Sequence, residues 1–441
     1  MKSIKKVYFV LLLFVSTLIV NCGIAYASPS YTAKVTADGA ILIDATSGDI
    51  LYEKNSNVSF PPASTTKIMT ALLTLENCKD LKEKVKITKE AESIDGSKIY
   101  IFKDEEITVE DLLYALLLSS ANDCAYALAV HIGGTYENFI SMMNKRASQL
   151  GCKNTNFINP HGLYNENHKS SAADLSLIMK ELIKHQKYIE ISSTPSYNMN
   201  ITNKCNKTRP LWNGNKAIHK FDSKHYKYTK ASKTGYTTQS QHSYVSYAEK
   251  DGQKFIVALT HDKDKNFYND SKTLFDFAFD NYHTTKLFNK GQVIKETSLN
   301  NTPMKLLAKG DLYITRSKNA SGDPIIKDIS FDTKNIASKV IKKNDFICTG
   351  TVTVDGRNVD FEIVSDRDYT PPKQLQVPSK SSHSILSSIL KYVFILLKYV
   401  LLAFIVFIIA RGLVKKYKRA KLRQLAVQNR RNNYMSRKKD E

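Results

Sequence analysis

Residues 61–70, with the sequence PPASTTKIMT, constrain the fold of this chain more than any other stretch. The two prolines end any extended segment before them, and the apolar run 68–75 predicts a helix buried on most of its faces. Ser64 is expected in the first turn of that helix, with Lys67 three residues later on the same face. A hydroxyl and an amine at a helix N-terminus, where free N–H groups favour negative charge, are the groups that acyl transfer by a nucleophile requires.

Two further motifs accompany this stretch. Ser120-Ala121-Asn122 follows an apolar helix predicted over 107–118, and Lys233-Thr234-Gly235 precedes a hairpin predicted over 243–260. Each motif also has an ordinary structural explanation: Ser64, Ser120 or Asn122 can cap a helix, and Lys233-Thr234-Gly235 can be an edge strand with a polar face. Three motifs in this order, each at the end of a predicted element, are a much stronger signal than any one of them alone.

The remaining elements are read from hydrophobic periodicity and turn residues. A hairpin is predicted over 39–54, and further helices over 123–131, 136–150, 172–185 and 270–282. Strands before and after a block of helices predict an α+β domain, with helices packed on an antiparallel sheet. From about residue 288 helical periodicity fades, and strand-like runs at 312–315, 325–331, 350–354 and 358–364 predict a small all-β domain.

Charge and cysteine content exclude several classes of function. The net charge of +22 is concentrated at the ends of the chain, the last 31 residues alone holding 12 Lys and Arg. The middle is only moderately basic and carries no nucleic-acid motif, so no nucleic-acid partner is expected. The cysteines show no C-x-x-C spacing, and His161 and His168 lack a third plausible ligand, so no metal or other cofactor is expected.

Both ends of the chain read as targeting or membrane segments. Residues 1–27 have a basic start, an apolar core and an Ala-Tyr-Ala cleavage site, which predicts a secretory signal peptide. A polar linker at 371–384 leads to the apolar segment 385–410, predicted to be a transmembrane helix; an interfacial amphipathic helix is the alternative. The basic tail 411–441 is then cytoplasmic, and the globular part lies outside the cell.

These motifs together resemble the penicilloyl-serine transferases, and within them the low-molecular-mass penicillin-binding proteins that act as serine-type D-alanyl-D-alanine carboxypeptidases. The resemblance rests on residues 61–70, on Ser-Ser-Ala-Asn-Asp at 119–123, on Asn-Pro-His-Gly-Leu at 159–163 and on Lys-Thr-Gly-Tyr-Thr at 233–237. It covers about residues 31–283. The β-rich segment and the C-terminal anchor also match the architecture of that family.

The resemblance implies a role for each site residue. It makes Ser64 the acyl-ester nucleophile, Lys67 the proton acceptor and Ser120 a proton relay. It assigns substrate binding to Asn122, Lys233, Thr234 and Gly235, and an oxyanion hole to the backbone N–H groups of Ser64 and Tyr236.

The same resemblance implies a domain plan and partners. A β-lactamase/transpeptidase-like penicillin-binding domain is expected over 28–284, followed by the all-β domain over 285–370. The implied substrates are peptidoglycan stem peptides ending in D-Ala-D-Ala, with β-lactams as covalent inhibitors. The expected location is the cell membrane, single-pass, with the catalytic domain on the extracytoplasmic face, and the Lys-, Asn- and Ile-rich composition favours a Gram-positive source.

Two departures from the family pattern bear on whether the cleft is active, and two alternatives are weighed. Residues 238–242 replace the usual Ala-Gly pair, and residues 230–232 replace the usual Asp-Gly, which is expected to narrow the cleft. One alternative is a class A-like serine β-lactamase. The other is a non-catalytic cell-wall-binding scaffold with a vestigial cleft.

Overall fold

The computed structural model describes residues 34–320, 322–331, 336–371, 395–396 and 398–399. The predicted signal peptide, the basic tail, and nearly all of the predicted linker and membrane anchor lie outside these residues. Within the described ranges, no helix is both long and apolar enough to cross a bilayer.

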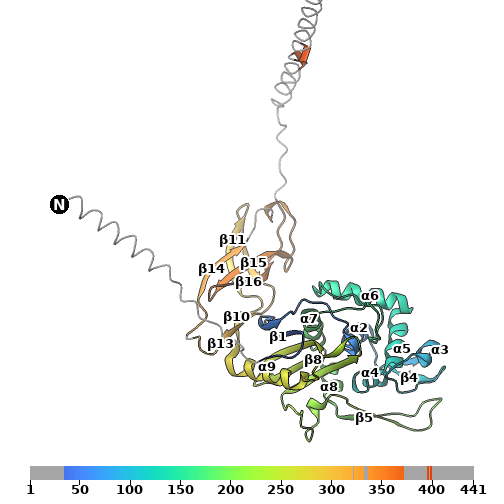
Figure 1. Cartoon of the computed structure of the whole chain (residues 1–441). Helices are drawn as coiled ribbons and strands as arrows, with labels where there is room; N and C mark the ends of the chain where they lie inside the picture. Colours follow the sequence, from blue (N-terminus) through green and yellow to red (C-terminus); the bar gives the residue numbers. More distant parts are fainter. Residues whose placement is uncertain (1–33, 321, 332–335, 372–394, 397, 400–441) are drawn as a thin grey trace, which may run out of the picture. The chain divides into compact units, whose positions relative to one another are not determined.

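A five-stranded antiparallel sheet forms the centre of the N-terminal part, in the order β2-β1-β9-β8-β7 (Figure 1). Its strands are β1 (Gly39–Asp44), β2 (Ile50–Lys54), β7 (Thr229–Thr237), β8 (Gln241–Lys250) and β9 (Gln253–Asp262). Both predicted hairpins are confirmed: β1 pairs with β2, and β8 pairs with β9 across the Asp251-Gly252 turn. Strand β7, which carries Lys233-Thr234-Gly235, lies at the edge of the sheet.

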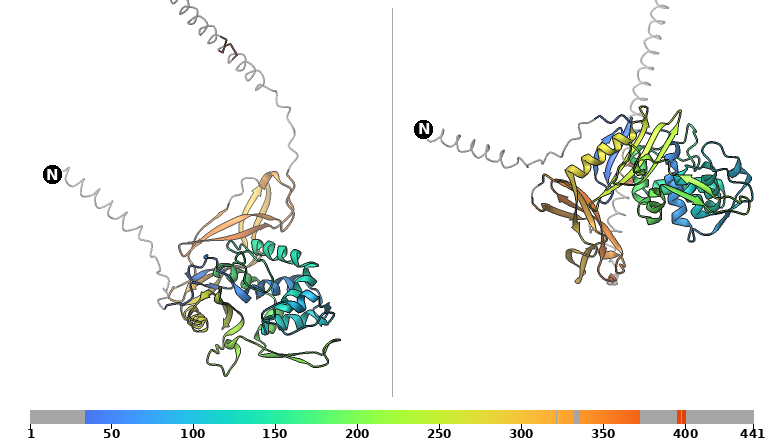
Figure 2. Two further views of the ribbon diagram at one scale, coloured as in Figure 1. Left: turned by 45° about the vertical axis from the view of Figure 1, so that its right-hand side comes forward. Right: turned by 90° about the horizontal axis from the view of Figure 1, so that it is seen from below.

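Alternate residues of the central strands enter two separate cores, as the period of two in a strand requires. Ile41 and Ile43 belong to a core shared with most of the helices, whereas Leu42 belongs to a second core shared with α9 (Phe267–Asn281). Helices therefore cover both faces of the sheet (Figures 1 and 2). On the first side lie α2 (Lys67–Asn77), α3 (Lys89–Ser93), α4 (Val109–Leu118), α5 (Asn122–Gly133), α6 (Tyr136–Gln149), α7 (Ala172–Leu182) and α8 (Gln186–Ser193).

The structure corrects several predicted boundaries. The helix predicted over 107–118 begins instead as strand β4 (Glu106–Thr108), which pairs with β3 (Lys84–Lys86). The helix predicted over 172–185 ends at Leu182 and is followed by the separate helix α8. A further hairpin, β5 (Ser196–Met199) with β6 (Arg209–Trp212), lies in the stretch that carried no periodic signal.

The C-terminal part is all-β, as predicted. Strand β10 (Tyr282–Phe288) pairs with β13 (Leu312–Ser317), and a five-stranded sheet has the order β11-β12-β16-β15-β14. The strands of this sheet are β11 (Val293–Leu299), β12 (Thr302–Ala308), β14 (Ile326–Phe331), β15 (Phe346–Val354) and β16 (Arg357–Ser365). Strands β10, β11 and β12 were not predicted. The predicted boundary between residues 284 and 285 stays a prediction.

Candidate active site

Ser64 lies in a 3₁₀ turn, η1 (Ala63–Thr66), that runs directly into α2. Hydroxyl groups fix this turn from within, because Thr65 donates to Pro62 O at 2.6 Å and Thr66 to Ala63 O at 2.8 Å. The prediction of an α-helical first turn was wrong in detail, since a tighter turn precedes the helix. The expected neighbour is nevertheless in place, with Lys67 Nζ 3.0 Å from Ser64 Oγ.

Lys67 is completely buried, and three oxygen atoms surround its amine. Its Nζ lies 3.0 Å from Ser64 Oγ, 2.7 Å from Asn122 Oδ1 and 2.6 Å from the carbonyl oxygen of His161. Burial holds the pKa of Lys67 well below its ordinary value, and the charge of Lys233 lowers it further. In the neutral form that a lowered pKa favours, the amine has two hydrogens for the two carbonyl-type oxygens, which leaves its lone pair for the Ser64 hydroxyl.

Ser120 and Asn122 lie at the junction of α4 and α5. Ser120 adopts a left-handed backbone conformation with φ of +56°, and Asn122 is the first residue of α5. Neither side chain caps the helix, because the residue at the cap position is Ala121, so the capping explanation was wrong. The Asn122 amide donates from Nδ2 to Asp95 O at 2.7 Å while its oxygen accepts from Lys67. The other N–H of that amide has no acceptor among the described residues.

Strand β7 carries a second buried amine to the same place. Lys233 Nζ donates to Ser120 Oγ at 2.9 Å and to Thr234 O at 2.8 Å, and burial lowers the pKa of Lys233 to about 7. Gly235 packs directly on the nucleophile turn: an added Cβ would lie 2.9 Å from the backbone nitrogen of Ser64. Only glycine allows this approach, which places the backbone of β7 beside Ser64.

The loop 159–163 supports the turn from the other side. Asn159 Oδ1 accepts from Gly162 N at 2.6 Å, and the folded loop presents the His161 carbonyl oxygen to Lys67. His168 Nδ1 accepts from Ile158 N at 2.9 Å, so the hydrogen of the neutral ring lies on Nε2, which donates to Thr66 Oγ1 at 2.8 Å. Both histidines serve as structural supports of the nucleophile turn, and the role of the His161 carbonyl was not predicted.

His168 makes stability dependent on pH. Burial and the charge of Lys67 lower its pKa to about 4, from about 6.5 in an unfolded chain. The unfolded state therefore binds more protons between these values, so stability is lost as the pH falls from 6.5 through 4, by about 3 kcal/mol from this group at pH 4. Urea unfolding at pH 7 and pH 4 measures the loss. His168→Gln, which cannot titrate, is expected to lose that much less; equal losses in both proteins contradict the assignment.

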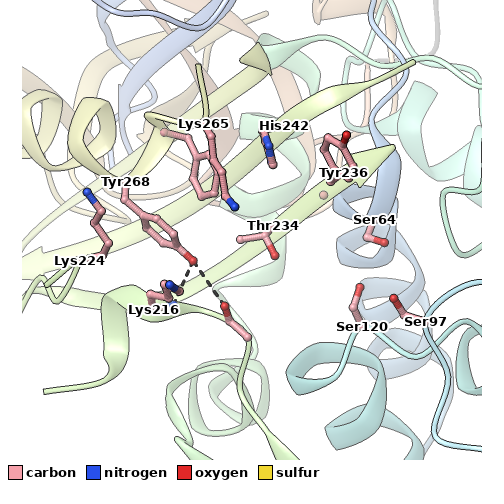
Figure 3. A pocket seen from close by; sticks show the side chains of 13 residues that line it. Ser64, Ser97, Ser120, Lys216, Lys224, Thr234, Tyr236, His242, Lys265 and Tyr268 are labelled. Carbon is pink, nitrogen blue, oxygen red and sulfur yellow. Dashed lines mark hydrogen bonds between the residues drawn. The ribbon is translucent and has the colours of Figure 1, made fainter. Parts of the chain in front are cut away.

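A pocket of about 520 Å³ opens over these groups (Figure 3). It is lined by Ser64, Ser97, Ser120, Gly214, Lys216, Lys224, Thr234, Gly235, Tyr236, His242, Lys265, Phe267 and Tyr268. Five predicted site residues line it directly, whereas Lys67, Asn122 and Lys233 lie buried behind its wall. The sequence did not reveal Ser97, the three other lysines or the aromatic wall of Phe267 and Tyr268.

The two departures from the family pattern have distinct positions. Residues 238–240 form the turn between β7 and β8, where Thr237 Oγ1 accepts from Ser240 N at 3.0 Å. Of residues 238–242 only His242 lines the pocket, stacked on Tyr236 with ring centroids 4.5 Å apart. Ser232 belongs to β7 itself, and its backbone N–H donates to Ser192 Oγ of α8 at 3.0 Å.

The chain matches two described protein families in succession. Residues 25–265 match the family described as D-alanyl-D-alanine carboxypeptidase, and residues 282–371 match that described as penicillin-binding protein 5, C-terminal domain.

Curated proteins and solved structures agree with these matches. D-alanyl-D-alanine carboxypeptidase DacF of Bacillus subtilis is 32% identical over 359 residues, covering 77% of this chain and 90% of the relative. DacA of Haemophilus influenzae is 29% identical over 350 residues, covering 76% and 86%. The structure of penicillin binding protein 5 from Haemophilus influenzae has a TM-score of 0.65 at 27% identity, covering 77% of this chain and 99% of that one. A D-alanyl-D-alanine carboxypeptidase from Mycobacterium tuberculosis has a TM-score of 0.53 at 27% identity, covering 58% and 95%.

Proposed function

Because the chain belongs to the D-alanyl-D-alanine carboxypeptidase family, we propose that Ser64 is the nucleophile with which it removes the terminal D-Ala of peptidoglycan stem peptides. The protein is a low-molecular-mass penicillin-binding protein and a serine-type hydrolase. One observation carries the assignment of Ser64. The buried amine of Lys67 is held by two carbonyl-type oxygens and faces the Ser64 hydroxyl at 3.0 Å.

Acylation begins when Lys67 takes the Ser64 proton and Ser64 Oγ bonds to the carbonyl carbon of the penultimate D-Ala. Negative charge then develops on the carbonyl oxygen. The backbone N–H groups of Ser64 and Tyr236 are proposed to stabilise it, each by about 3 kcal/mol in the transition state. The close packing of Gly235 on the Ser64 nitrogen supports this pairing, since it brings β7 to the nucleophile turn.

The scissile C–N bond then breaks, and the departing amine must gain a proton. Ser120 is proposed to relay that proton, because its hydroxyl lines the pocket and is hydrogen-bonded to Lys233. Lys233 holds the terminal carboxylate by charge and Thr234 by its hydroxyl. Free D-Ala leaves, and water hydrolyses the Ser64 ester to release the shortened peptide. A β-lactam acylates Ser64 by the same first step and leaves slowly.

The position of β7 supports binding of an extended peptide. An edge strand offers unpaired backbone groups, to which a peptide can add as a further strand. The remaining N–H of the Asn122 amide is proposed to bind the amide oxygen of that peptide from the opposite wall.

The test combines acylation with turnover. A chain of residues 28–382 is incubated with a penicillin, and intact-mass and peptide mass spectrometry locate the adduct; release of D-Ala from a D-Ala-D-Ala peptide is measured in parallel. A lasting adduct on Ser64 together with D-Ala release is the expected result. Rapid drug hydrolysis without an adduct favours the β-lactamase alternative. If there is neither an adduct nor any hydrolysis of drug or peptide, the scaffold alternative is favoured.

We further propose that residues 385–410 anchor the protein in the membrane, with the catalytic part on the extracytoplasmic side. The proposal rests on the apolar sequence of that segment and the basic tail after it. After an alkaline carbonate wash, the full chain is expected to stay in the membrane fraction, and a chain ending at Ser384 to be soluble outside the cell. Penicillin labelling of both chains verifies that they are folded. Release of the full chain by the wash contradicts a spanning anchor and favours the interfacial alternative.

A further inference from the structure

The end of the pocket remote from Ser64 is lined by basic side chains without acidic partners in the lining. Lys216, Lys224 and Lys265 contribute amines there, whereas none of the thirteen lining residues is Asp or Glu. The three serines lie at the opposite end, and Thr234 stands between the serines and the lysines (Figure 3). A space of about 520 Å³ lies in the range of pockets that hold drug-sized ligands, well beyond a single small residue.

The charges of these lysines are poorly compensated in the part of the chain that the structure describes. Lys224 Nζ donates to Asn269 Oδ1, a neutral amide oxygen, at 3.2 Å. The acidic group paired with Lys216 is Asp222 at 4.0 Å, the limit of an ion pair, and no ion pair is formed by Lys265 among the described residues. Lys265 also acts on His242, which lines the pocket. Burial lowers the pKa of His242, and the charge of Lys265 lowers it further. Amines in this arrangement attract an anion from solution.

A hydrogen bond and a series of aromatic contacts hold the segments that carry these lysines in place. The Tyr268 hydroxyl accepts the backbone N–H of Lys216 at 3.0 Å, which joins the segment after Gly214 to the first turn of α9. Phe267 packs on Tyr268 and on His242, with ring centroids 4.5 Å and 5.5 Å apart, and His242 stacks on Tyr236 of β7. This continuous series of aromatic contacts connects the basic end of the pocket to β7, the strand beside the nucleophile. Packing therefore sets the distance between the basic end and Thr234.

We infer that this basic end is a subsite for a leaving group that carries a second carboxylate, in addition to the one held by Lys233 and Thr234. The inference rests on the proposed function, in which the terminal carboxylate binds at Thr234 and the leaving group lies beyond it from Ser64. A terminal D-Ala has no atoms that reach further. An acidic D-amino acid does, and so does a second stem peptide joined through an amine and bearing a free carboxylate.

The chemistry is unchanged from D-Ala release. Ser64 Oγ bonds to the D-Ala carbonyl carbon, the C–N bond breaks, and the amine of the acidic leaving group takes up one proton. Water then cleaves the ester. Only the binding of the departing part differs, because its additional carboxylate meets the amines of Lys224 and Lys265.

The test is a pair of peptides that differ in one charge. For the full chain in detergent, kcat/KM is measured for diacetyl-L-Lys-D-Ala-D-Glu, for the same peptide ending in D-Gln, and for D-Ala-D-Ala. We expect about 10-fold higher kcat/KM for D-Glu than for the isosteric D-Gln, the order of a hydrogen bond to a charged group. The ratio is expected to fall with increasing salt.

Matched variants locate the effect. Lys224→Gln with Lys265→Gln is expected to bring the D-Glu to D-Gln ratio close to one. Lys220→Gln with Lys263→Gln removes the same number of charges from exposed positions of the same two segments outside the pocket, and is expected to keep the ratio. A wild-type ratio of one or below, or a ratio that the double variant leaves unchanged, overturns the subsite.

Failure of the subsite is separable from failure of the proposed function. Cleavage of D-Ala-D-Ala with acylation of Ser64, but without preference for D-Glu, refutes the subsite alone. If no peptide is cleaved, the proposed function fails, and calorimetric binding of the two peptides to Ser64→Ala still decides the subsite. Tighter binding of the D-Glu peptide supports it, and equal binding refutes it.

Discussion

Ser64→Ala is expected to lower kcat for D-Ala release by at least about 10⁴-fold and to abolish the covalent adduct with penicillin. The substitution removes the one hydroxyl that the Lys67 amine contacts in the described part of the chain. Lys67 keeps Asn122 Oδ1 and the His161 carbonyl oxygen as acceptors, so the fold is expected to persist. Quantification of released D-Ala, intact-mass spectrometry and the melting temperature measure the three effects.

Ser97 provides the control for this substitution. Its side chain lines the same pocket, but the residue contacts the site through its backbone, whose carbonyl oxygen accepts from Asn122 N at 2.6 Å. Ser97→Ala is therefore expected to change kcat by less than about 10-fold, which is no more than the effect of losing one ordinary hydrogen bond. A larger effect of Ser97→Ala than of Ser64→Ala would contradict the assignment of Ser64 as the nucleophile.

Gly162→Ala is expected to inactivate the enzyme, although the substituted residue is not one of those proposed to react. A Cβ at position 162 would lie 1.9 Å from the carbonyl oxygen of Ala63 and 2.9 Å from the backbone nitrogen of Ser64. Both atoms are backbone, so the nucleophile turn or the loop 159–163 must move. We expect a loss of about 3 kcal/mol or more in the free energy of unfolding, together with loss of penicillin acylation. Urea unfolding and labelling of the folded fraction measure the two effects.

Gly151→Ala separates the collision from backbone strain. Gly151 has a φ of +84°, close to the +88° of Gly162, but an added Cβ there meets nothing within 4 Å. This variant is expected to lose only about 1 kcal/mol, the order expected for forcing a left-handed conformation on alanine, and to keep full acylation. If both variants lose the same free energy of unfolding, backbone strain alone explains the effect and the collision does not contribute.

The contacts that the sequence predicted are local or carried by short motifs. Ser64 and Lys67 are three residues apart, so helical periodicity alone places them together. Asp251-Gly252 identified the β8–β9 hairpin because the turn needs positive φ, and both residues have it. The joining of Ser120 and Lys233 followed from the family resemblance, since nothing in their spacing requires Lys233 Nζ to reach Ser120 Oγ.

The features that the sequence did not reveal depend on backbone atoms or on distant packing. The His161 acceptor is a carbonyl oxygen, which every residue possesses, so the residue type carries no signal for it. Lys216 and Lys265 are distant in the sequence but line one pocket, where the Tyr268 hydroxyl binds the segment after Gly214 to α9. Strand β11 was missed because it has no clear apolar face: its first six side chains are half or fully exposed, and Leu299 at its end is the buried one.

The pairing of β1 with β9 sets the order in which this protein can be completed. Strand β1 begins at Gly39, but its neighbour on the inner side of the sheet ends at Asp262. The long segment between β1 and β9 must lose conformational entropy before the two strands can pair, which makes this pairing slow to form. During synthesis from the N-terminus, the apolar strand β1 therefore has only β2 as a neighbour in the sheet until β9 has been made. A chain that ends before β9 therefore lacks the central pairing of the sheet, although it already contains Ser64, Ser120 and Lys233.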